Sequence, residues 1–351
     1  MAGNKCLNAS LKAGNNEFYT RLEDIENELK YYKKHFQGKV VLCNCDDPYE
    51  SNFFKYFALN FNSFGLKKLI ATCYNGSPIA GDELPLLFEL EEIEPKKIAY
   101  KVEITEVQDY NGDGAVNLAD VQWLIQNDKN VLSLLKENGD FRSSECVELL
   151  KEADIVVTNP PFSSLFREYV AQLMEYNKKF LIIGNQNAIH YKEIFPLIMQ
   201  NKLWTGYTNP KLFRIPNDAI GKSVKMIDGV KYQQLGYICW YTNLDIQKRH
   251  ESLLLVKSYN SEEYPKYDNY EAIECAKVAN IPVDYNGLMG VPTTFVDKYN
   301  PEQFEIIGIL NHGCDSEYDL AKPILNGKEK FSRILIRRRQ SNGENNKNDN
   351  E

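Results

Sequence analysis

Two short apolar runs flank an aromatic-rich segment, and this arrangement constrains the fold more than any other part of the sequence. The first run is "KVVLC", from residue 39, and the second lies within "LKKLIATCY", from residue 66. Between them, "NCDDPYESNFFKYF" has helical spacing, and we expect Asp47 to cap the helix, Pro48 to be its first residue and Gly65 to close it. Strand, helix and strand at this short spacing predict a parallel α/β sheet.

The same pattern occurs again further along the chain. "SSECVELLKEADIVVTNPPF" combines a helix with the buried strand Ile155-Val156-Val157, and "LFREYVAQLMEYNKKFLIIGNQN" gives another helix and strand. "YQQLGYICWYTNLD" fits a late strand of the same sheet. Beyond about residue 249 the sequence changes to short Tyr-, Asn- and Pro-rich pieces, for which we expect loops and few long elements. The polar end "SNGENNKNDNE" predicts a disordered tail.

The amino-acid composition indicates in which cellular compartment the protein works and whether it contacts a membrane. The chain has 351 residues, of which 43% are apolar and 26% charged, as in ordinary soluble proteins. No apolar run is long enough for a membrane span or a secretory signal, so we predict a cytoplasmic protein without membrane contact. Eight cysteines without any CxxC pair predict reduced thiols.

The net charge of −8 argues against nucleic-acid binding, but its distribution matters more than its sum. "KEKFSRILIRRR", from Lys328 to Arg339, concentrates positive charge near the carboxyl end. We predict that Arg333, Arg337 and Arg338 bind DNA, although an ordinary solvated tail fits the basic run equally well.

The tetrapeptide Asn159-Pro160-Pro161-Phe162 ends a predicted buried strand, where ligands bind in open parallel sheets. The Asn159 side-chain oxygen and the Pro160 carbonyl supply two rigid hydrogen-bond acceptors for an exocyclic amino group, which becomes nucleophilic when both its hydrogens are held. Phe162 suits stacking on a flipped base. We therefore predict an amino-methyltransferase with catalytic residues Asn159, Pro160 and Phe162; plain strand termination is the alternative.

The methyl donor for such a reaction is S-adenosylmethionine, and its candidate binding residues precede the tetrapeptide. Asp46 and Asp47 end the first strand, where carboxylates suit the positive methionine part of the donor. Asp140 suits the amino hydrogens of the donor adenine and Phe141 its ring. Asn159 belongs to both sites. Helix capping by Asp47 and a simple Gly-Asp turn at Asp140 remain alternative interpretations.

With these motifs in place, the sequence resembles the EcoRI-type adenine-specific DNA methyltransferases. The resemblance is carried by "NEFYT", "VLCNCDDPYESNFFKYFALNF", "GDFRSSE", "DIVVTNPPFSSLFREY", "KKFLIIGNQN", "SEEYPKYDNY" and "DYNGLMGVPTTF". It implies methylation of the adenine amino nitrogen in a short palindromic duplex DNA site by a largely monomeric enzyme that flips its target base. It also implies that Phe18 and Tyr19 cover the methionine end of the donor.

For the architecture, the resemblance implies a Rossmann-like class I methyltransferase sheet with an inserted lobe and a carboxyl-terminal target-recognition region. We expect a catalytic domain over residues 1–248 with an insert at about 75–138, a DNA target-recognition region over 249–340, and a disordered tail over 341–351. A cognate restriction endonuclease acting on the same site, without direct contact, is an expected partner, but an orphan enzyme fits as well. The usual Gly-rich loop and ribose-binding acidic residue are missing, and no residue is assigned to the ribose.

The insert contains a second motif, "DYNGDGAVNLADVQWLI", which begins at Asp109. Six of its residues fall at the ligand positions of a calcium loop, with Gly114 at the turn and Asp120 in place of the usual Glu. The predicted calcium ligands are Asp109, Asn111, Asp113, Ala115, Asn117 and Asp120. A single loop of this kind is similar to half of a dockerin module, and a metal-free Asn-Gly-Asp-Gly turn fits the same residues.

Two other functions also fit the sequence. The same tetrapeptide chemistry serves methylation of RNA adenine and of protein glutamine. A calcium-stabilised interaction module that has lost catalysis is a different kind of function, against which the intact "NEFYT", "GDFRSSE" and NPPF motifs argue. The large carboxyl-terminal region, with its tyrosines and arginines, favours DNA.

Overall fold

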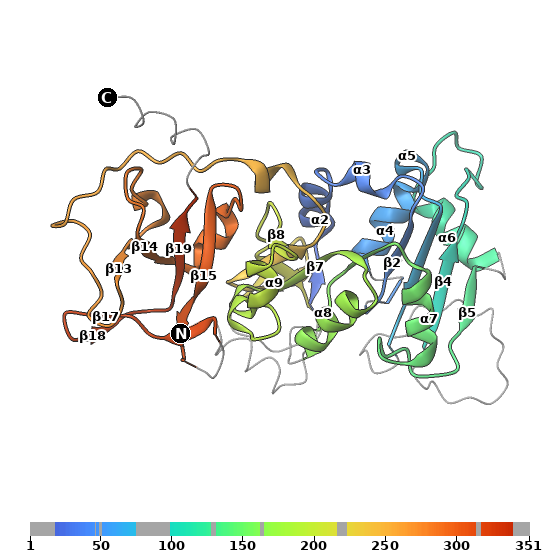
Figure 1. Cartoon of the computed structure of the whole chain (residues 1–351). Coiled ribbons are helices and arrows are strands. Elements are labelled where there is room, and N and C mark those ends of the chain that lie inside the picture. The colour runs from blue at the N-terminus through green and yellow to red at the C-terminus, as the bar shows by residue number, and fades with distance from the viewer. Residues whose placement is uncertain are drawn as a thin grey trace, which may run out of the picture. The chain divides into compact units, whose positions relative to one another are not determined.

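The computed structural model describes residues 18–45, 47–48, 51–74, 99–127, 131–161, 165–215, 223–313 and 317–339 (Figure 1). Asp46, Phe162, residues 75–98 of the expected insert and the tail 341–351 lie outside these residues. The chain forms two compact units. The first comprises residues 1–186 and 206–244, and the second comprises residues 187–205 and 245–351.

The first unit contains a mixed sheet whose strands run in the order β5-β4-β3-β2-β6-β7-β12. Neighbours in the stretch β3-β2-β6-β7 are parallel, whereas β5, β4 and β12 are antiparallel to their neighbours. The strands are β2 (Val40–Cys43), β3 (Lys68–Thr72), β4 (Tyr100–Ile104), β5 (Leu132–Leu134), β6 (Ile155–Thr158), β7 (Lys179–Asn185) and β12 (Ile238–Thr242). The expected α/β class is confirmed, but the sheet is mixed, because β4, β5 and β12 add antiparallel strands to the predicted parallel stretch.

Continuous apolar sequence explains the centre of this sheet. Every residue of β2, β6 and β12 is buried, as expected for strands that are covered on both faces. Among the helices, α4 packs on β3, α7 on β2 and α8 on β7. The helices of this unit are α2 (Leu22–Leu29), α3 (Lys33–Phe36), α4 (Asn52–Leu59), α5 (Phe61–Phe64), α6 (Leu118–Asn127), α7 (Ser144–Glu152) and α8 (Leu165–Glu175).

The helix after β2 begins later than the sequence predicted. It starts at Asn52, and the Ser51 hydroxyl caps it by accepting a hydrogen bond from the Phe54 amide at 3.3 Å. The predicted N-cap, Asp47, accepts instead from the distant hydroxyl of Tyr100, so the prediction was wrong about the cap. Gly65 ends the segment as expected, with a φ of 59°.

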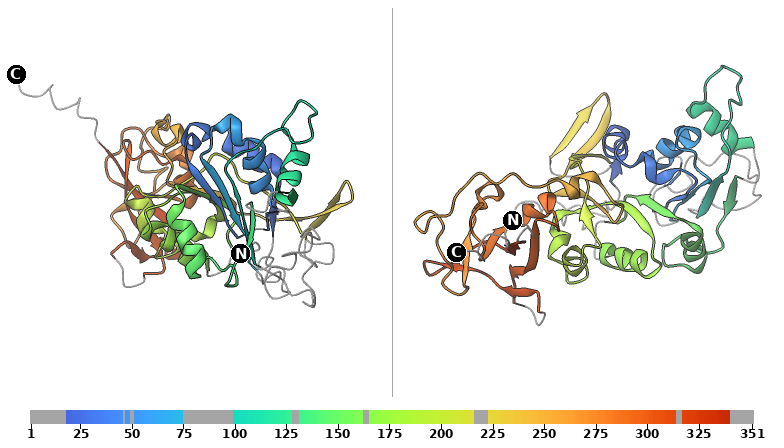
Figure 2. Two further views of the ribbon diagram at one scale, coloured as in Figure 1. Left: turned by 90° about the vertical axis from the view of Figure 1, so that its right-hand side faces the viewer. Right: turned by 45° about the horizontal axis from the view of Figure 1, so that its top comes forward.

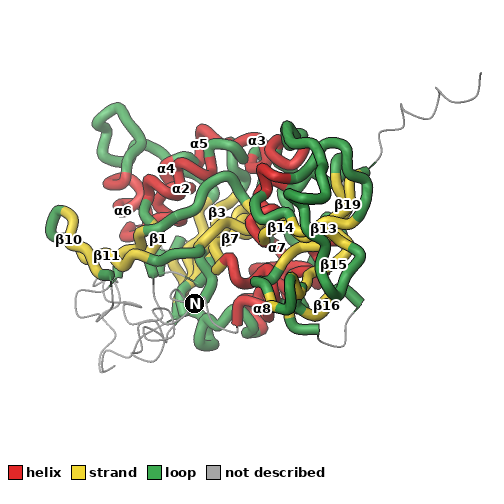
Figure 3. The backbone as a smooth tube through the Cα atoms, turned by 90° about the vertical axis from the view of Figure 1, so that its left-hand side faces the viewer, coloured by secondary structure: helices red, strands yellow, loops and turns green. Residues whose placement is uncertain are grey.

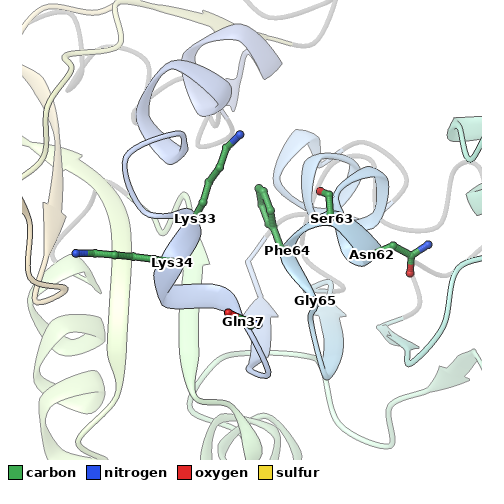
Figure 4. Close-up of a pocket in the computed structure, with 7 residues that line it drawn as sticks. All are labelled: Lys33, Lys34, Gln37, Asn62, Ser63, Phe64 and Gly65. Atoms are coloured by element: carbon green, nitrogen blue, oxygen red, sulfur yellow. The ribbon is translucent and has the colours of Figure 1, made fainter.

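Aromatic rings hold α3, α4 and α5 together. Phe36 lies against Phe57 and Phe64, with ring centroids 5.0 and 5.7 Å apart. A surface pocket of about 450 Å³ lies between α3 and α5 and is lined by residues that include Lys33 and Lys34 (Figure 4). Gln37 and Gly65, which line it too, precede β2 and β3, so the pocket is at the amino ends of these strands.

A smaller antiparallel sheet, which we call the hairpin sheet, also belongs to the first unit. Its strands run in the order β1-β9-β11-β10, and the hairpin β10–β11 stands out from the rest of its unit (Figure 2). The strands are β1 (Tyr19–Thr20), β9 (Leu212–Arg214), β10 (Val224–Ile227) and β11 (Val230–Gln234). The turn of the hairpin is Asp228-Gly229, a pair that favours two-residue hairpin loops.

The second unit contains a sheet in the order β13-β14-β19-β15-β16 (Figure 3). Its central strand, β19, carries the buried side chains Ile334, Leu335 and Ile336 inside the basic run. The expectation of mainly loops after residue 249 was therefore wrong for this part of the chain. The strands are β13 (Ala272–Glu274), β14 (Leu288–Pro292), β15 (Phe304–Asn311), β16 (Asp319–Ala321) and β19 (Arg333–Arg338), with a separate hairpin of β17 (Ile324–Leu325) and β18 (Lys328–Glu329).

Helix α9 (Phe195–Met199) and the short strand β8 (Trp204–Thr205) also belong to the second unit. None of the helices in the described ranges is both long and apolar enough to cross a membrane. Of the six cysteines within these ranges, all but Cys45 are buried.

Candidate active site

Asn159 lies directly after β6, at the carboxyl end of the parallel strands, and its side chain is almost completely buried. Its amide nitrogen donates a hydrogen bond to the backbone carbonyl of Phe18. Within the described part of the chain, its buried side-chain oxygen has no hydrogen-bond partner. A buried polar atom without a partner costs about 1–3 kcal/mol, so this oxygen is well suited to accept from a ligand.

The amino-terminal segment that holds Asn159 is itself fixed by the hairpin sheet. Phe18 and Tyr19 are buried, and Tyr19 pairs with Arg214 of β9. The Asn52 amide nitrogen, at the start of α4, donates to the Thr20 carbonyl at 2.7 Å. The structure thus brings the predicted residue Phe18 into contact with Asn159, although 141 positions separate them.

The ends of β2 and β6 are tied to each other and to α8. The hydroxyl of Thr158 donates to the backbone carbonyl of Asn44, and the hydroxyl of Tyr169 donates to the Asn44 side-chain oxygen. Burial raises the pKa of Tyr169 well above its ordinary value, so it stays a neutral donor. These contacts fix the segment on which Asn159 lies.

The turn after β2 replaces the missing Gly-rich loop. Cys45 adopts a φ of 79°, a left-handed conformation that is uncommon for residues other than glycine. Asp47 is buried, and the Tyr100 hydroxyl donates to both its carboxylate oxygens at 2.9 Å. Tyr100 comes from β4, so the carboxylate is anchored inside the sheet rather than at a helix end.

Asp140 and Phe141 precede α7 and are held in two different ways. The Asp140 carboxylate accepts from Arg142 Nη2 and Nε at 2.7 and 2.8 Å, and Arg142 lowers its pKa. Phe141 packs edge-on against Tyr169 with centroids 5.1 Å apart. Tyr169 therefore connects Phe141 with Asn44 at the end of β2.

Gly139 sets the approach of this segment to the sheet. Its φ is 75°, and a Cβ atom there would lie 2.0 Å from the carbonyl oxygen of Cys73, which directly follows β3. Only glycine permits so close a contact. Residues 139–141 are thereby placed beside the carboxyl end of β3.

The calcium-like loop is closed by its own hydrogen bonds. The Asp109 carboxylate accepts from the amides of Gly112 and Gly114 at 2.7 Å, and the fully buried Asp120 accepts from the amide of Asn117 at 2.8 Å. Asn111, Asp113, Ala115 and Asn117 take part in further bonds within the loop. Among the residues that the structure describes, no three His, Cys, Asp or Glu side chains lie together as a metal-binding group, so a calcium ion in this loop would also need the Asn111 and Asn117 side chains and the Ala115 carbonyl.

The predicted DNA-binding arginines lie on β19 in the second unit. Arg333 forms a bidentate ion pair with the buried Glu274 at 2.6 and 3.2 Å, and the Tyr267 hydroxyl also donates to Glu274. Arg337 pairs with Glu305 at 2.8 Å. Arg338 is the last residue of the strand and is half-buried.

Two features that shape this site, Tyr100 and the hairpin β10–β11, were not predicted from the sequence. Tyr100 gave no local signal, because its partner Asp47 lies 53 residues away. The hairpin β10–β11 did have a signal, since Asp228-Gly229 stands between Met226-Ile227 and Val230.

Comparison with known proteins gives one consistent result. A family model described as adenine-specific methyltransferase EcoRI matches residues 6–349. The type II methyltransferase M.EcoRI of Escherichia coli is 45% identical over 97% of this chain and 98% of its own length. The type II methyltransferase M.MpnI of Mycoplasma pneumoniae is 37% identical over 95% of this chain and 98% of its own length. No solved structure matches.

Proposed function

Because this chain belongs to the family of EcoRI-type adenine-specific methyltransferases, we propose that Asn159 and Pro160 hold the amino group of the target adenine during methyl transfer. The protein is an adenine-specific DNA methyltransferase, and its methyl donor is S-adenosylmethionine. The observation that carries the proposal is the buried, unpartnered side-chain oxygen of Asn159 at the carboxyl end of β6.

The contact with Phe18 determines what Asn159 can do. Its amide nitrogen is engaged by the Phe18 carbonyl, so the amide cannot turn over and its oxygen remains the acceptor. With the Pro160 carbonyl as second acceptor, both hydrogens of the adenine amino group are held, and the nitrogen lone pair turns toward the donor. The bound donor supplies an electrophilic methyl group. The amino proton becomes acidic once the nitrogen is alkylated and leaves to solvent, so no general base is needed beforehand.

Other residues complete the proposed pocket. Phe162 stacks on the adenine after it has flipped out of the duplex. Phe18 and Tyr19 cover the methionine end of the donor, and Asp46 and Asp47 face its positive charge. This donor position is supported by the Asp47 carboxylate, which the Tyr100 hydroxyl holds in place after the end of β2.

Asp140 and Phe141 bind the adenine end of the donor. Asp140 accepts three hydrogen bonds, from Nε, Nη2 and the backbone amide of Arg142, and a carboxylate offers about four acceptor positions. One position is thus left for the amino group of the donor adenine. Arg142 keeps the carboxylate charged and fixed in place.

For the whole chain, we assign the first unit to a Rossmann-like catalytic domain, in which the range 75–138 of the expected insert supplies β4 and β5 of the main sheet. The second unit is the target-recognition region; because Arg333 is engaged by the buried Glu274, Arg337 and Arg338 are the candidates for DNA contact among the three predicted arginines. The enzyme acts as a cytoplasmic monomer, and a restriction endonuclease that cuts the same site is its expected counterpart. The loop over residues 109–120 holds a structural calcium ion.

The first experiment is incubation of the protein with tritiated S-adenosylmethionine and a mixture of duplex DNA, RNA and protein, followed by nucleoside and amino-acid analysis. We expect label as methyladenine in duplex DNA, at a site that sequencing then identifies. Label confined to RNA or protein would overturn the choice of substrate while leaving the chemistry intact.

The second experiment tests Asn159. Asn159→Ala removes an acceptor used in the transition state, so turnover should fall by roughly 10²–10³-fold, whereas the donor affinity measured by calorimetry should fall far less, because the other donor-site residues remain. Asn127→Ala makes the same change at an exposed position on α6 and serves as the control. Substantial activity in Asn159→Ala would refute the assignment.

A further inference from the structure

The hairpin sheet connects the catalytic asparagine with an exposed edge of the first unit. Its innermost strand, β1, directly follows Phe18, whose carbonyl holds Asn159. Its outermost strands, β10 and β11, project from the unit (Figure 2). At the tip, Met226 is 64% and Ile227 38% exposed.

The strand register places four side chains in one cross-strand row. Tyr19 pairs with Arg214, Arg214 with Tyr232, and Tyr232 with Lys225. Directly paired residues point to the same face of a sheet, so aromatic and cationic side chains alternate along this row. At roughly 4.8 Å per strand, the row extends about 14 Å from Tyr19 to Lys225.

The two faces of the hairpin sheet differ in burial. The neighbouring row contains Gln233, Phe213 and Thr20, which are all buried. In the Tyr19 row, Tyr19 itself is buried, whereas Arg214 and Lys225 are exposed and Tyr232 is partly exposed. Beyond Tyr19, this row therefore faces solvent, while Thr20, Phe213 and Gln233 of the neighbouring row pack on the unit.

Charge on the hairpin sheet is opposite to that of the chain. Its described segments 211–215 and 223–234 carry Lys211, Arg214, Lys225 and Lys231 against one acidic residue, Asp228, although the whole chain has a net charge of −8. Concentrated positive charge with interleaved aromatic rings suits a nucleic-acid backbone. Arg214 and Lys225 are two strand spacings apart, about 9.6 Å, or about three phosphate steps of 3.4 Å along a duplex axis.

We propose that the Arg214–Tyr232–Lys225 row is a second DNA-contact surface, which lies in the catalytic unit and binds phosphates next to the target adenine. This inference rests on the proposed function, because it takes duplex DNA as the substrate. The row positions the DNA backbone beside Asn159, separately from the arginines of the second unit. It contributes affinity and placement rather than base recognition.

The test is the salt dependence of DNA binding. Binding of a duplex that contains the methylated site, mapped with the wild-type protein, is measured by fluorescence anisotropy between about 50 and 200 mM salt. Each phosphate contact contributes about 0.9 to the slope of log K against log salt, so R214Q/K225Q should lower the slope by about 1.8 and K225Q by about 0.9. R214K/K225R keeps the charges and should restore much of the slope.

The matched control is K33Q/K34Q, which removes two exposed positive charges from α3 beside the pocket at the amino ends of the strands (Figure 4). It should bind DNA with the wild-type slope. Donor binding and thermal melting verify that each variant is folded, and K225Q remains informative if R214Q/K225Q fails to fold. For the row variants, kcat/KM for DNA should fall more than kcat.

Two outcomes would overturn the inference. One is an unchanged slope in both K225Q and R214Q/K225Q, and the other is an equal decrease in K33Q/K34Q, which would indicate a general charge effect. In either case, methylation of duplex DNA by the wild type would leave the proposed function standing. A wild-type protein that neither binds nor methylates DNA would instead refute the proposed function and this inference together.

Discussion

The side chain of Asn159 shows how one residue prepares a reaction without touching a ligand. Its amide nitrogen donates a hydrogen bond to the Phe18 carbonyl, and its amide oxygen is buried without a hydrogen-bond partner in the described structure. Burying this oxygen without a hydrogen bond lowers the stability of the fold by about 1–3 kcal/mol, and a bound amino group removes this penalty. Position and residue type were predictable from the NPPF motif, whereas the contact with Phe18 was not, because it depends on the pairing of β1 with β9.

At Asp140, the ion pair with Arg142 leads to a prediction about donor binding and pH. The pKa of Asp140 is lowered from its ordinary value of 3.8, so the carboxylate is charged above that pH and loses its ion pair only as the pH falls below it. Asp140→Asn should raise the Kd for S-adenosylmethionine about tenfold. In the wild-type protein, the contribution of the Asp140 carboxylate to donor affinity should be constant from about pH 5 to 8.

Glu168 offers the control for this prediction. It also pairs with Arg142, at 3.2 Å, but is more exposed than Asp140. Calorimetry of Glu168→Gln should give the wild-type Kd, and both variants should keep the free energy of unfolding within about 1 kcal/mol. Equal effects of the two substitutions would mean that Asp140 has no specific role toward the donor.

Gly139 illustrates a requirement that sequence shows only as a Gly-Asp pair. Gly139→Ala combines a positive φ with a contact of 2.0 Å to the Cys73 carbonyl, so unfolding in urea should show a loss of more than about 2 kcal/mol. Gly229→Ala shares the positive φ but has nothing within 4 Å, and should cost about 1 kcal/mol. Similar losses at both positions would show that the close contact does not matter.

Among the elements, the loop before α6 allows a direct test of calcium binding. Tyr110 stacks on Trp123 of α6 with centroids 4.8 Å apart, so the fluorescence of Trp123 reports on the loop. If calcium binds, saturating Ca²⁺ should change this fluorescence and stabilise the fold by about 2.7 kcal/mol at 100 times Kd. Mg²⁺, which demands a tighter octahedral site, should not replace it.

Asp113→Asn provides the contrast for the loop, because it removes a charged ligand while keeping a side chain that can hydrogen-bond. It should abolish or greatly weaken the calcium response without changing the metal-free melting temperature by more than a few degrees. A wild-type protein that does not respond to Ca²⁺ would identify the loop as a turn closed by its own hydrogen bonds.

The strands show how far patterns predict elements. Apolar runs such as β2 and β6 could be located from the sequence because all their residues are buried. β19 was missed because arginines surround only three buried residues, and its partners β14 and β15 are defined by pairing, not by local sequence. A run of apolar residues predicts that a strand is buried, but it does not predict with which distant strand it pairs.

For the whole molecule, the proposed monomer leads to a prediction about the order of methylation. A single chain holds one adenine at a time, so the two strands of a palindromic site should be methylated in separate binding events. With DNA in excess, hemimethylated duplex should accumulate before the fully methylated product. Sedimentation of the protein–DNA complex should give one protein chain per duplex, and simultaneous methylation of both strands would contradict the monomer.

The path of the chain through the first unit has a consequence for its synthesis. Asn159 obtains its orientation from Phe18, and the segment that contains Phe18 is paired with β9, which ends at Arg214. A ribosome that has made residues 1–162 has thus produced every catalytic residue but not the strand that holds them in position. The nascent protein is expected to remain inactive until translation has passed β9, so that synthesis of the catalytic tetrapeptide alone does not start any modification of DNA.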